Sequence, residues 1–237
     1  MSLISRGPRR ALVAALVASL TLVGACSKDD SGSDGASPAE VMKEAQAKLD
    51  ETSGLELSLT TKDLPDGVQG LSGATGVATD APAFDGTITV VIAGTNVPVP
   101  VIAVDGKVYA QIPLTTGWSD VDPGDYGAPD PADLVTPETG FSSLLPATTD
   151  LEKGSTARGG KDNNEILTVY HGKVPGDAMK KVIPSSSGDS FDATYQVSDG
   201  GELREAQFTG VFYKDSDPMT YTVTFENYGT TKTITAP

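Results

Sequence analysis

The strongest constraint on the fold is a run of alternating apolar and other residues over 84–112, broken by two turn sequences. Such alternation predicts β-strands with one apolar face. Gly94-Thr95 is interpreted as the first two-residue turn, which would place Val90 opposite Val99, and Asp105-Gly106 as the second. Directly opposed residues share a face, so both turns predict a single apolar face. Its members are Ile88, Val90, Ile92, Val97, Val99, Val101, Ala103, Val108, Ala110 and Ile112. Pro98 and Pro100 would point away from it and indicate an edge or a bulge.

The flanking sequence predicts more strands and a few helices. Ser37, Pro38 and Glu40 form a capping-box sequence, and Val41, Ala45 and Leu49 then share one face of a helix over 38–51. Short helices are expected within 130–147 and over 174–183. Alternation predicts strands at 55–60, 166–173, 191–197, 203–213 and 221–227, with a last strand after Gly229. The predicted fold class is α+β, with residues 38–237 as one domain whose large antiparallel sheet carries helices on one face.

Charge and side-chain chemistry exclude several function classes. The chain has 32 acidic and 17 basic residues, a net charge of −15, so it lacks the excess of basic residues that general nucleic-acid binding needs. A single Cys cannot form an intramolecular disulfide, and one His excludes a multi-His metal site. We expect His171 to be structural. Nucleophile-elbow and phosphate-loop motifs are absent from the sequence, so an enzyme is not expected.

The first 25 residues are typical of a secretory signal peptide. Arg6, Arg9 and Arg10 precede fifteen uncharged residues, fewer than the roughly 20 that span a bilayer. The segment ends Gly24-Ala25-Cys26, which resembles a bacterial lipobox, so Cys26 is the predicted lipidation site. The alternatives are a soluble secreted protein or export through a twin-arginine signal. Multiple acyl chains would anchor the mature protein on the extracytoplasmic face of the cell membrane.

Residues 26–37 are expected to be the lipidated Cys and a flexible tether, since they are small, polar or charged. Residues 1–25 contain three Arg and no acid, so residues 26–237 keep 14 basic and 32 acidic side chains, a net charge of −18. Anionic headgroups would repel such a surface. The lipid anchor, rather than surface charge, is therefore expected to hold the protein on the membrane.

Three questions about the remaining residues stay open. Asp120, Asp122, Asp125 and Asp130 crowd one segment, which is interpreted as a solvated acidic loop in preference to a weak metal site. No metal and no cofactor are predicted. A carboxylate pair for glycoside hydrolysis would need two of the 32 acids, and the sequence singles out none. Trp118 and Tyr126 would either guard an opening or pack a loop.

The predicted sheet face consists of Val, Ile and Ala, without a large aromatic among the ten positions. Small residues leave space for a ligand unless the helices fill it, and such an apolar space would suit acyl chains. The alternative is an ordinary packed core, because Val and Ile are residues that strands prefer.

Several motifs in a fixed order resemble the LppX/LprAFG family of actinobacterial lipoproteins. The lipobox, tether and capped helix come first, followed by Trp118-Ser119-Asp120, Asp130-Pro131 and Leu144-Leu145. Two further stretches carry the resemblance: Val104-Asp105-Gly106-Lys107-Val108-Tyr109-Ala110 and Pro137-Glu138-Thr139-Gly140. The departures are the lengths of the tether and C-terminus, and Ser185-Ser186-Ser187-Gly188, which would alter a rim loop.

The resemblance implies a half-barrel sheet wrapped over helices and enclosing a hydrophobic cavity. It also implies binding and transport of acylated lipids and glycolipids, including phosphatidylinositol mannosides, lipoarabinomannan-type molecules and triacylglycerol, with a major-facilitator exporter as a plausible partner. The expected cavity residues are Ile88, Val90, Ile92, Val99, Val101, Val108, Ala110, Ile112, Val41, Ala45, Leu134, Phe141 and Leu144. The alternative function is a non-carrier envelope lipoprotein that docks on an exporter, and a hydrolase is the third hypothesis.

Overall fold

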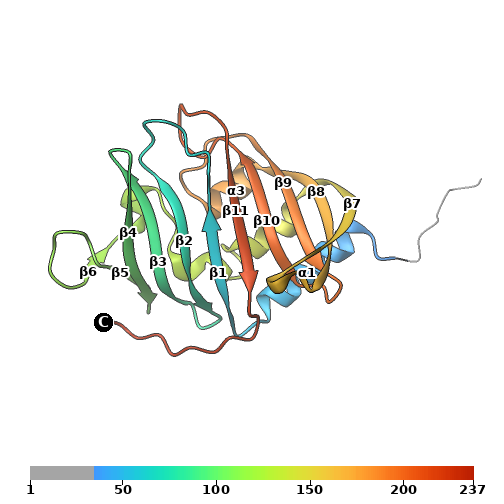
Figure 1. Ribbon diagram of the computed structural model, residues 1–237, viewed down its shortest axis with the longest axis horizontal. Coiled ribbons are helices and arrows are strands. Elements are labelled where there is room, and N and C mark those ends of the chain that lie inside the picture. Colours follow the sequence, from blue (N-terminus) through green and yellow to red (C-terminus); the bar gives the residue numbers. More distant parts are fainter. Residues whose placement is uncertain (1–34) are drawn as a thin grey trace, which may run out of the picture. The chain divides into compact units, whose positions relative to one another are not determined.

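The computed structural model describes residues 35–237, apart from the side chain of Lys161. The signal peptide, Cys26 and nearly all of the tether lie outside the described residues. Ala36–Pro237 forms one compact unit. Within it, eleven antiparallel strands form a single sheet in the order β6-β5-β4-β3-β2-β1-β11-β10-β9-β8-β7 (Figure 1). The edge strands β6 and β7 do not pair with each other, so the predicted large antiparallel sheet is confirmed and it is open.

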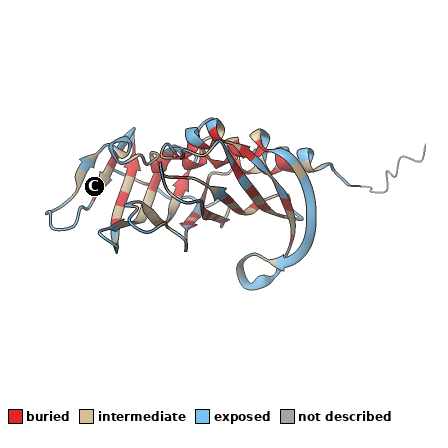
Figure 2. Cartoon of the chain, turned by 90° about the horizontal axis from the view of Figure 1, so that it is seen from above, coloured by how far each residue is buried: buried red, intermediate tan, exposed pale blue. Residues whose placement is uncertain are grey.

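The strands are β1 (Gly54–Thr60), β2 (Leu71–Thr79), β3 (Ala83–Ile92), β4 (Thr95–Val104), β5 (Lys107–Ala110), β6 (Ser119–Val121), β7 (Thr149–Gly159), β8 (Glu165–Pro175), β9 (Ser190–Ser198), β10 (Leu203–Gly210) and β11 (Met219–Glu226). The helices are α1 (Pro38–Asp50), α2 (Leu144–Ala147) and α3 (Gly176–Val182), with short 3₁₀ turns η1 (Pro123–Tyr126), η2 (Pro131–Val135), η3 (Phe141–Ser143) and η4 (Lys161–Asn163). Figure 1 shows α1, α3 and the segment between β6 and β7 behind the sheet. Figure 2 shows buried residues where strands and helices meet, whereas β7 is exposed along nearly its whole length.

The capping box of α1 is confirmed. The Ser37 hydroxyl accepts a hydrogen bond from the Glu40 amide at 3.3 Å, and the Ser37 amide donates to the Glu40 carboxylate at 2.7 Å. The buried stripe of α1 differs from the predicted one. It consists of Met42, Ala45 and Leu49, while Val41 is half-buried. Positions i, i+3 and i+7 therefore face the sheet, in place of i, i+4 and i+8.

The predicted sheet face is confirmed, although one register is wrong. The Asp105-Gly106 turn pairs Val104 with Lys107, as predicted. The other turn is Ala93-Gly94, where both residues have positive φ (50° and 74°), as a type I′ turn requires. Val90 therefore lies opposite Val97 instead of Val99. This shift of two residues leaves every side chain on its predicted face, because successive side chains of a strand alternate between the faces.

The two prolines of β4 lie outside the ladder that this strand forms with β5. The β5 ladder ends at Val101–Ala110, and beyond it the Gln111 amide donates to the Pro100 carbonyl at 3.0 Å. Residues 95–99, which include Pro98, thus form a local edge beside β5, and Pro100 lies where the ladder ends. The missing N–H groups consequently remove no bond of the ladder between β4 and β5.

Three expectations at strand ends are wrong. Ile92 is 50% exposed, because it is the last residue of β3, and Ile112 is 37% exposed, because β5 ends two residues earlier. No strand follows Gly229 in the described chain. There, the Thr230 amide donates to the Gly54 carbonyl at 3.0 Å, but β1 is already paired on both sides and offers no free edge.

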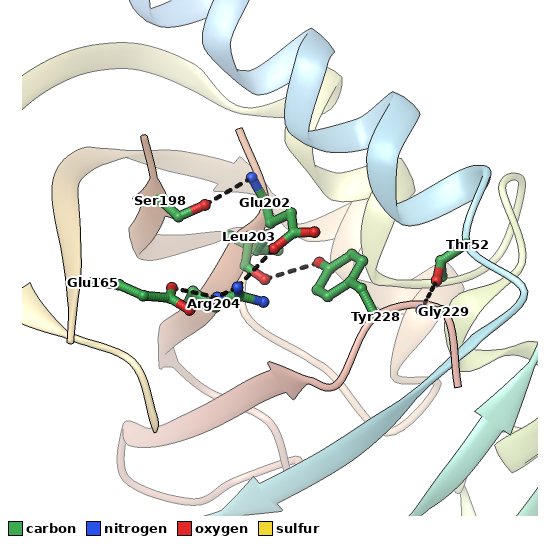
Figure 3. Close-up of polar contacts among 8 residues, drawn as sticks. All are labelled: Thr52, Glu165, Ser198, Glu202, Leu203, Arg204, Tyr228 and Gly229. Carbon is green, nitrogen blue, oxygen red and sulfur yellow. Dashed lines mark hydrogen bonds and ion pairs between the residues drawn. The ribbon is translucent and has the colours of Figure 1, made fainter. Parts of the chain in front are cut away.

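An ion-pair cluster ties the chain after β11 to the starts of β8 and β10 (Figure 3). The Arg204 guanidinium makes two contacts with Glu165, at 2.6 and 2.8 Å, and one with Glu202 at 2.6 Å. It lies 5.5 Å from the centre of the Tyr228 ring, whose hydroxyl donates to the Leu203 carbonyl at 2.8 Å. The charged and polar groups of this cluster pair with one another, which indicates a structural role.

Candidate functional site

The helix-covered face of the sheet has two halves with different packing. Aromatic side chains fill the half formed by β9, β10, β11 and β1, where Phe141 of η3 lies 6.3 Å from Phe208 and 6.0 Å from Phe225 between ring centres. Tyr195 packs edge-on against Phe208, and its hydroxyl is 2.7 Å from the Thr148 hydroxyl. This half is a closed, interlocked core.

Strands β2 to β5 present much smaller residues on the same face. The one aromatic there is Phe84, which is 1% exposed. Its ring occupies the space above Gly76, since a Cβ atom added to that glycine would lie 2.5 Å from the ring. The other buried residues of this small-residue face are Ala74, Ala78, Val99, Val101, Ala103, Val108 and Ala110.

A single short turn, η2, covers the middle of the small-residue face. It packs against β2, β3 and β4. Asp130 caps it by accepting a hydrogen bond from the Ala132 amide at 2.9 Å, and Leu134 and Val135 are buried beneath it. Toward the turn between β3 and β4, the same face continues as a half-open strip of partly buried apolar residues: Leu71, Ile88, Val90 and Val97.

A pocket of about 570 Å³ opens between the β5–β6 edge, η1, η2 and α3. Its size is within the range of about 300–1,000 Å³ that is usual for ligand sites. Apolar lining comes from Val108, Val121, Leu134 and Val182. The charged groups around it are Lys107, Asp120, Asp122, Asp130, Asp133 and Lys181. Apolar and charged side chains thus both line the pocket, which offers contacts for a hydrocarbon chain and for a polar group.

The rim carries both signs of charge. The Lys107 ammonium lies 2.9 Å from the Asp120 carboxylate, and both side chains are more than half exposed. Burial raises the pKa of the Asp133 carboxyl above its ordinary range, and the nearby Asp130 carboxylate raises it further. The carboxylates of η2 thus disfavour additional negative charge at this opening.

The predicted cavity residues fall into groups. Val108 and Leu134 line the pocket, Val99, Val101 and Ala110 are buried on the small-residue face, and Ile88 and Val90 belong to the half-open strip. The others do not join this site. Ala45, Phe141 and Leu144 are buried in the main core, Val41 packs at its margin, and Ile92 and Ile112 are exposed.

Sequence reasoning missed Val121 and Val182 as lining residues. Val121 continues the alternation of the sheet face beyond the β5–β6 loop, and it lies opposite Val108. That pairing is visible only in the structure, because β6 has three residues and is too short for a recognisable alternation. Three members of the acidic segment, Asp120, Asp122 and Asp130, line the pocket, yet the described residues contain no group of three His, Cys, Asp or Glu that could hold a metal. His171 is exposed, 3.2 Å from the Thr194 hydroxyl.

These features define a class of α+β domain in which an open antiparallel sheet carries helices and a ligand-sized pocket on one face. The LppX_LprAFG lipoprotein family model matches residues 37–236. The chain therefore belongs to the LppX_LprAFG lipoprotein family. No curated protein matches the chain.

Solved structures of two mycobacterial lipoproteins are similar to this domain. LprF from Mycobacterium bovis aligns with a TM-score of 0.68 and 13% identity, over 84% of this chain and 96% of LprF. Lipoprotein LppX from Mycobacterium tuberculosis aligns with a TM-score of 0.60 and 16% identity, over 84% of this chain and 98% of LppX. At such identities the likeness establishes the fold. Among residues 35–237, no helix combines the length and apolar character needed to cross a membrane.

Proposed function

We propose that this lipoprotein binds acylated lipids, including di- and triacylated glycolipids, and carries them through the cell envelope. The observation that supports this proposal best is the small-residue face, with a pocket at the β5–β6 edge and a half-open apolar strip toward the β3–β4 turn. Acyl chains would lie between this face and η2, and the polar headgroup would stay at the charged rim.

The proposed mechanism is partitioning between the bilayer and the protein. Each methylene group buried away from water contributes ~0.8 kcal/mol. A chain that leaves a bilayer loses the same contribution there, so the net free energy of transfer is small and exchange runs in both directions. The proposal also includes lipidation of Cys26 as the membrane anchor and a major-facilitator exporter as a partner.

A test is mass spectrometry of lipid extracted from residues 27–237, purified from a host that makes the native envelope lipids. The segment Ala36–Pro237 is compact on its own, so the chain without residues 1–26 is expected to fold. A stoichiometric lipid with two or three acyl chains would support the carrier. Empty protein that also fails to take up added glycolipid would contradict it and favour the alternative, an exporter-docking module.

A further inference from the structure

The loop between β5 and β6, residues 111–118, is an uncharged apolar projection. Its sequence is Gln-Ile-Pro-Leu-Thr-Thr-Gly-Trp, without one ionisable side chain, in a chain with a net charge of −15. Leu114 is fully exposed, at 106% of its reference area, and Ile112 is 37% exposed. Figure 1 shows this loop extending beyond the sheet at the β6 edge.

The backbone holds Leu114 in this exposed position. Leu114 has φ 69°, a left-handed conformation that residues other than glycine, Asn and Asp rarely adopt. A small turn fixes it, since both the amide and the hydroxyl of Thr115 donate to the Ile112 carbonyl, at 3.1 and 2.8 Å. Exposure and backbone strain both disfavour this arrangement in water. A partner that buries the Leu114 side chain would remove the first of these costs.

The composition of the loop fits a lipid surface. Trp and uncharged apolar residues are the ones that enter the membrane interface. Asp120 is the first carboxylate after the loop. It is paired with Lys107, which offsets its negative charge near the lipid headgroups. A stable protein partner would require about 800 Å² on each side, more than a loop with a few apolar side chains offers.

The loop leads directly to the proposed ligand site. Trp118 immediately precedes β6, whose Asp120 and Val121 line the pocket. An extended tether of eleven residues from the predicted Cys26 anchor spans at most about 40 Å, so the domain would remain close to the membrane. We propose that the 111–118 loop inserts into the bilayer surface and holds the pocket against it. This inference rests on the proposed lipid-carrier function.

Trp118 is the only Trp of the chain and therefore reports on the loop directly. The experiment uses the anchored mature protein in phosphatidylcholine vesicles whose acyl chains carry bromine, a contact quencher. We expect the Trp118 fluorescence to fall about twofold relative to unbrominated vesicles, with a blue-shifted emission. Leu114→Asn should abolish both effects. Because Asn tolerates positive φ, this variant should not lower the melting temperature.

Ile166→Asn is the matched control, because Ile166 is an exposed apolar residue (39%) on β8, near the opposite sheet edge. It should keep the quenching. Quenching that persists in Leu114→Asn would come from lipid in the pocket and would overturn loop insertion. Wild-type protein that shows no quenching in the brominated phosphatidylcholine vesicles would overturn it too, and would point to a protein partner for the loop.

Lipid extracted from the same preparations separates the two proposals. Bound lipid without quenching would contradict loop insertion and support the lipid-carrier function. Quenching without bound lipid would support loop insertion and contradict the lipid-carrier function.

Discussion

Filling the small-residue face should prevent lipid binding without unfolding the domain, and Ile88→Trp is the sharpest way to do it. Ile88 lies on β3 between Ala74 and Val99, and its side chain is half-buried in the open strip. The indole can therefore turn toward the open side, and we expect a stability loss below about 1.5 kcal/mol. An indole displaces about three to four methylene groups of a bound chain, worth ~0.8 kcal/mol each, or about 3 kcal/mol. This free energy corresponds to more than about a hundredfold weaker loading.

Thr89→Trp is the control, since Thr89 neighbours Ile88 on the same strand, lies opposite Pro98 and faces the other side of the sheet. The assay combines lipid per protein by mass spectrometry with thermal unfolding of each variant. Val90→Trp should behave like Ile88→Trp. If both variants keep full lipid loading at unchanged stability, the assignment of the ligand to this face is refuted.

Three further substitutions test individual parts of the structure. Asp50→Asn should raise the melting temperature near neutral pH, because burial raises the pKa of the Asp50 carboxyl and so disfavours its charged form. In thermal scans this gain should vanish as the pH falls below the ordinary aspartate pKa of about 3.9, where the wild-type carboxyl is neutral in the folded and the unfolded state. Tyr221→Phe removes the hydroxyl that donates to the Leu71 carbonyl at 2.6 Å, and urea unfolding should show a loss of about 1–2 kcal/mol. Asp130→Ala removes the cap of η2, which should cost about 1 kcal/mol of local stability and speed hydrogen exchange at the Ala132 amide; unchanged exchange would show that the cap does not hold η2.

Local patterns in the sequence predicted the sheet face better than they predicted its edges. The alternation over residues 84–112 placed ten residues on one face, and a two-residue register error between β3 and β4 did not disturb it. Alternation does not say where pairing stops. Ile92 and Ile112 satisfied the pattern, but the turn at Ala93 and the end of β5 at Ala110 leave them exposed.

Contacts between distant segments could not be predicted in the same way. Phe141 packs on Phe208 and Phe225 from a 3₁₀ turn more than sixty residues away in the sequence, and no local periodicity encodes that contact. The resemblance implies a place for Phe141 in the cavity, whereas the structure buries its ring in the main core. A short helix near Asp130-Pro131 was expected, but its packing on β2, β3 and β4 was not, because that contact also joins distant segments.

The small size of η2, which covers the small-residue face, fits the proposed partitioning mechanism. Transfer of a lipid from bilayer to protein has a small net free energy, so little is available to displace whatever covers the face. Displacing a whole helix would expose many buried side chains, each worth about 1.5–3 kcal/mol. Within η2, only Leu134 and Val135 are large aliphatic residues, and one cap at Asp130 holds the turn. Contact with the bilayer would reduce the cost further, because apolar side chains released by η2 at a lipid surface need not enter water. Under the proposed function, a one-turn cover over a small-residue face, together with the proposed insertion of the 111–118 loop, would allow lipid to exchange reversibly.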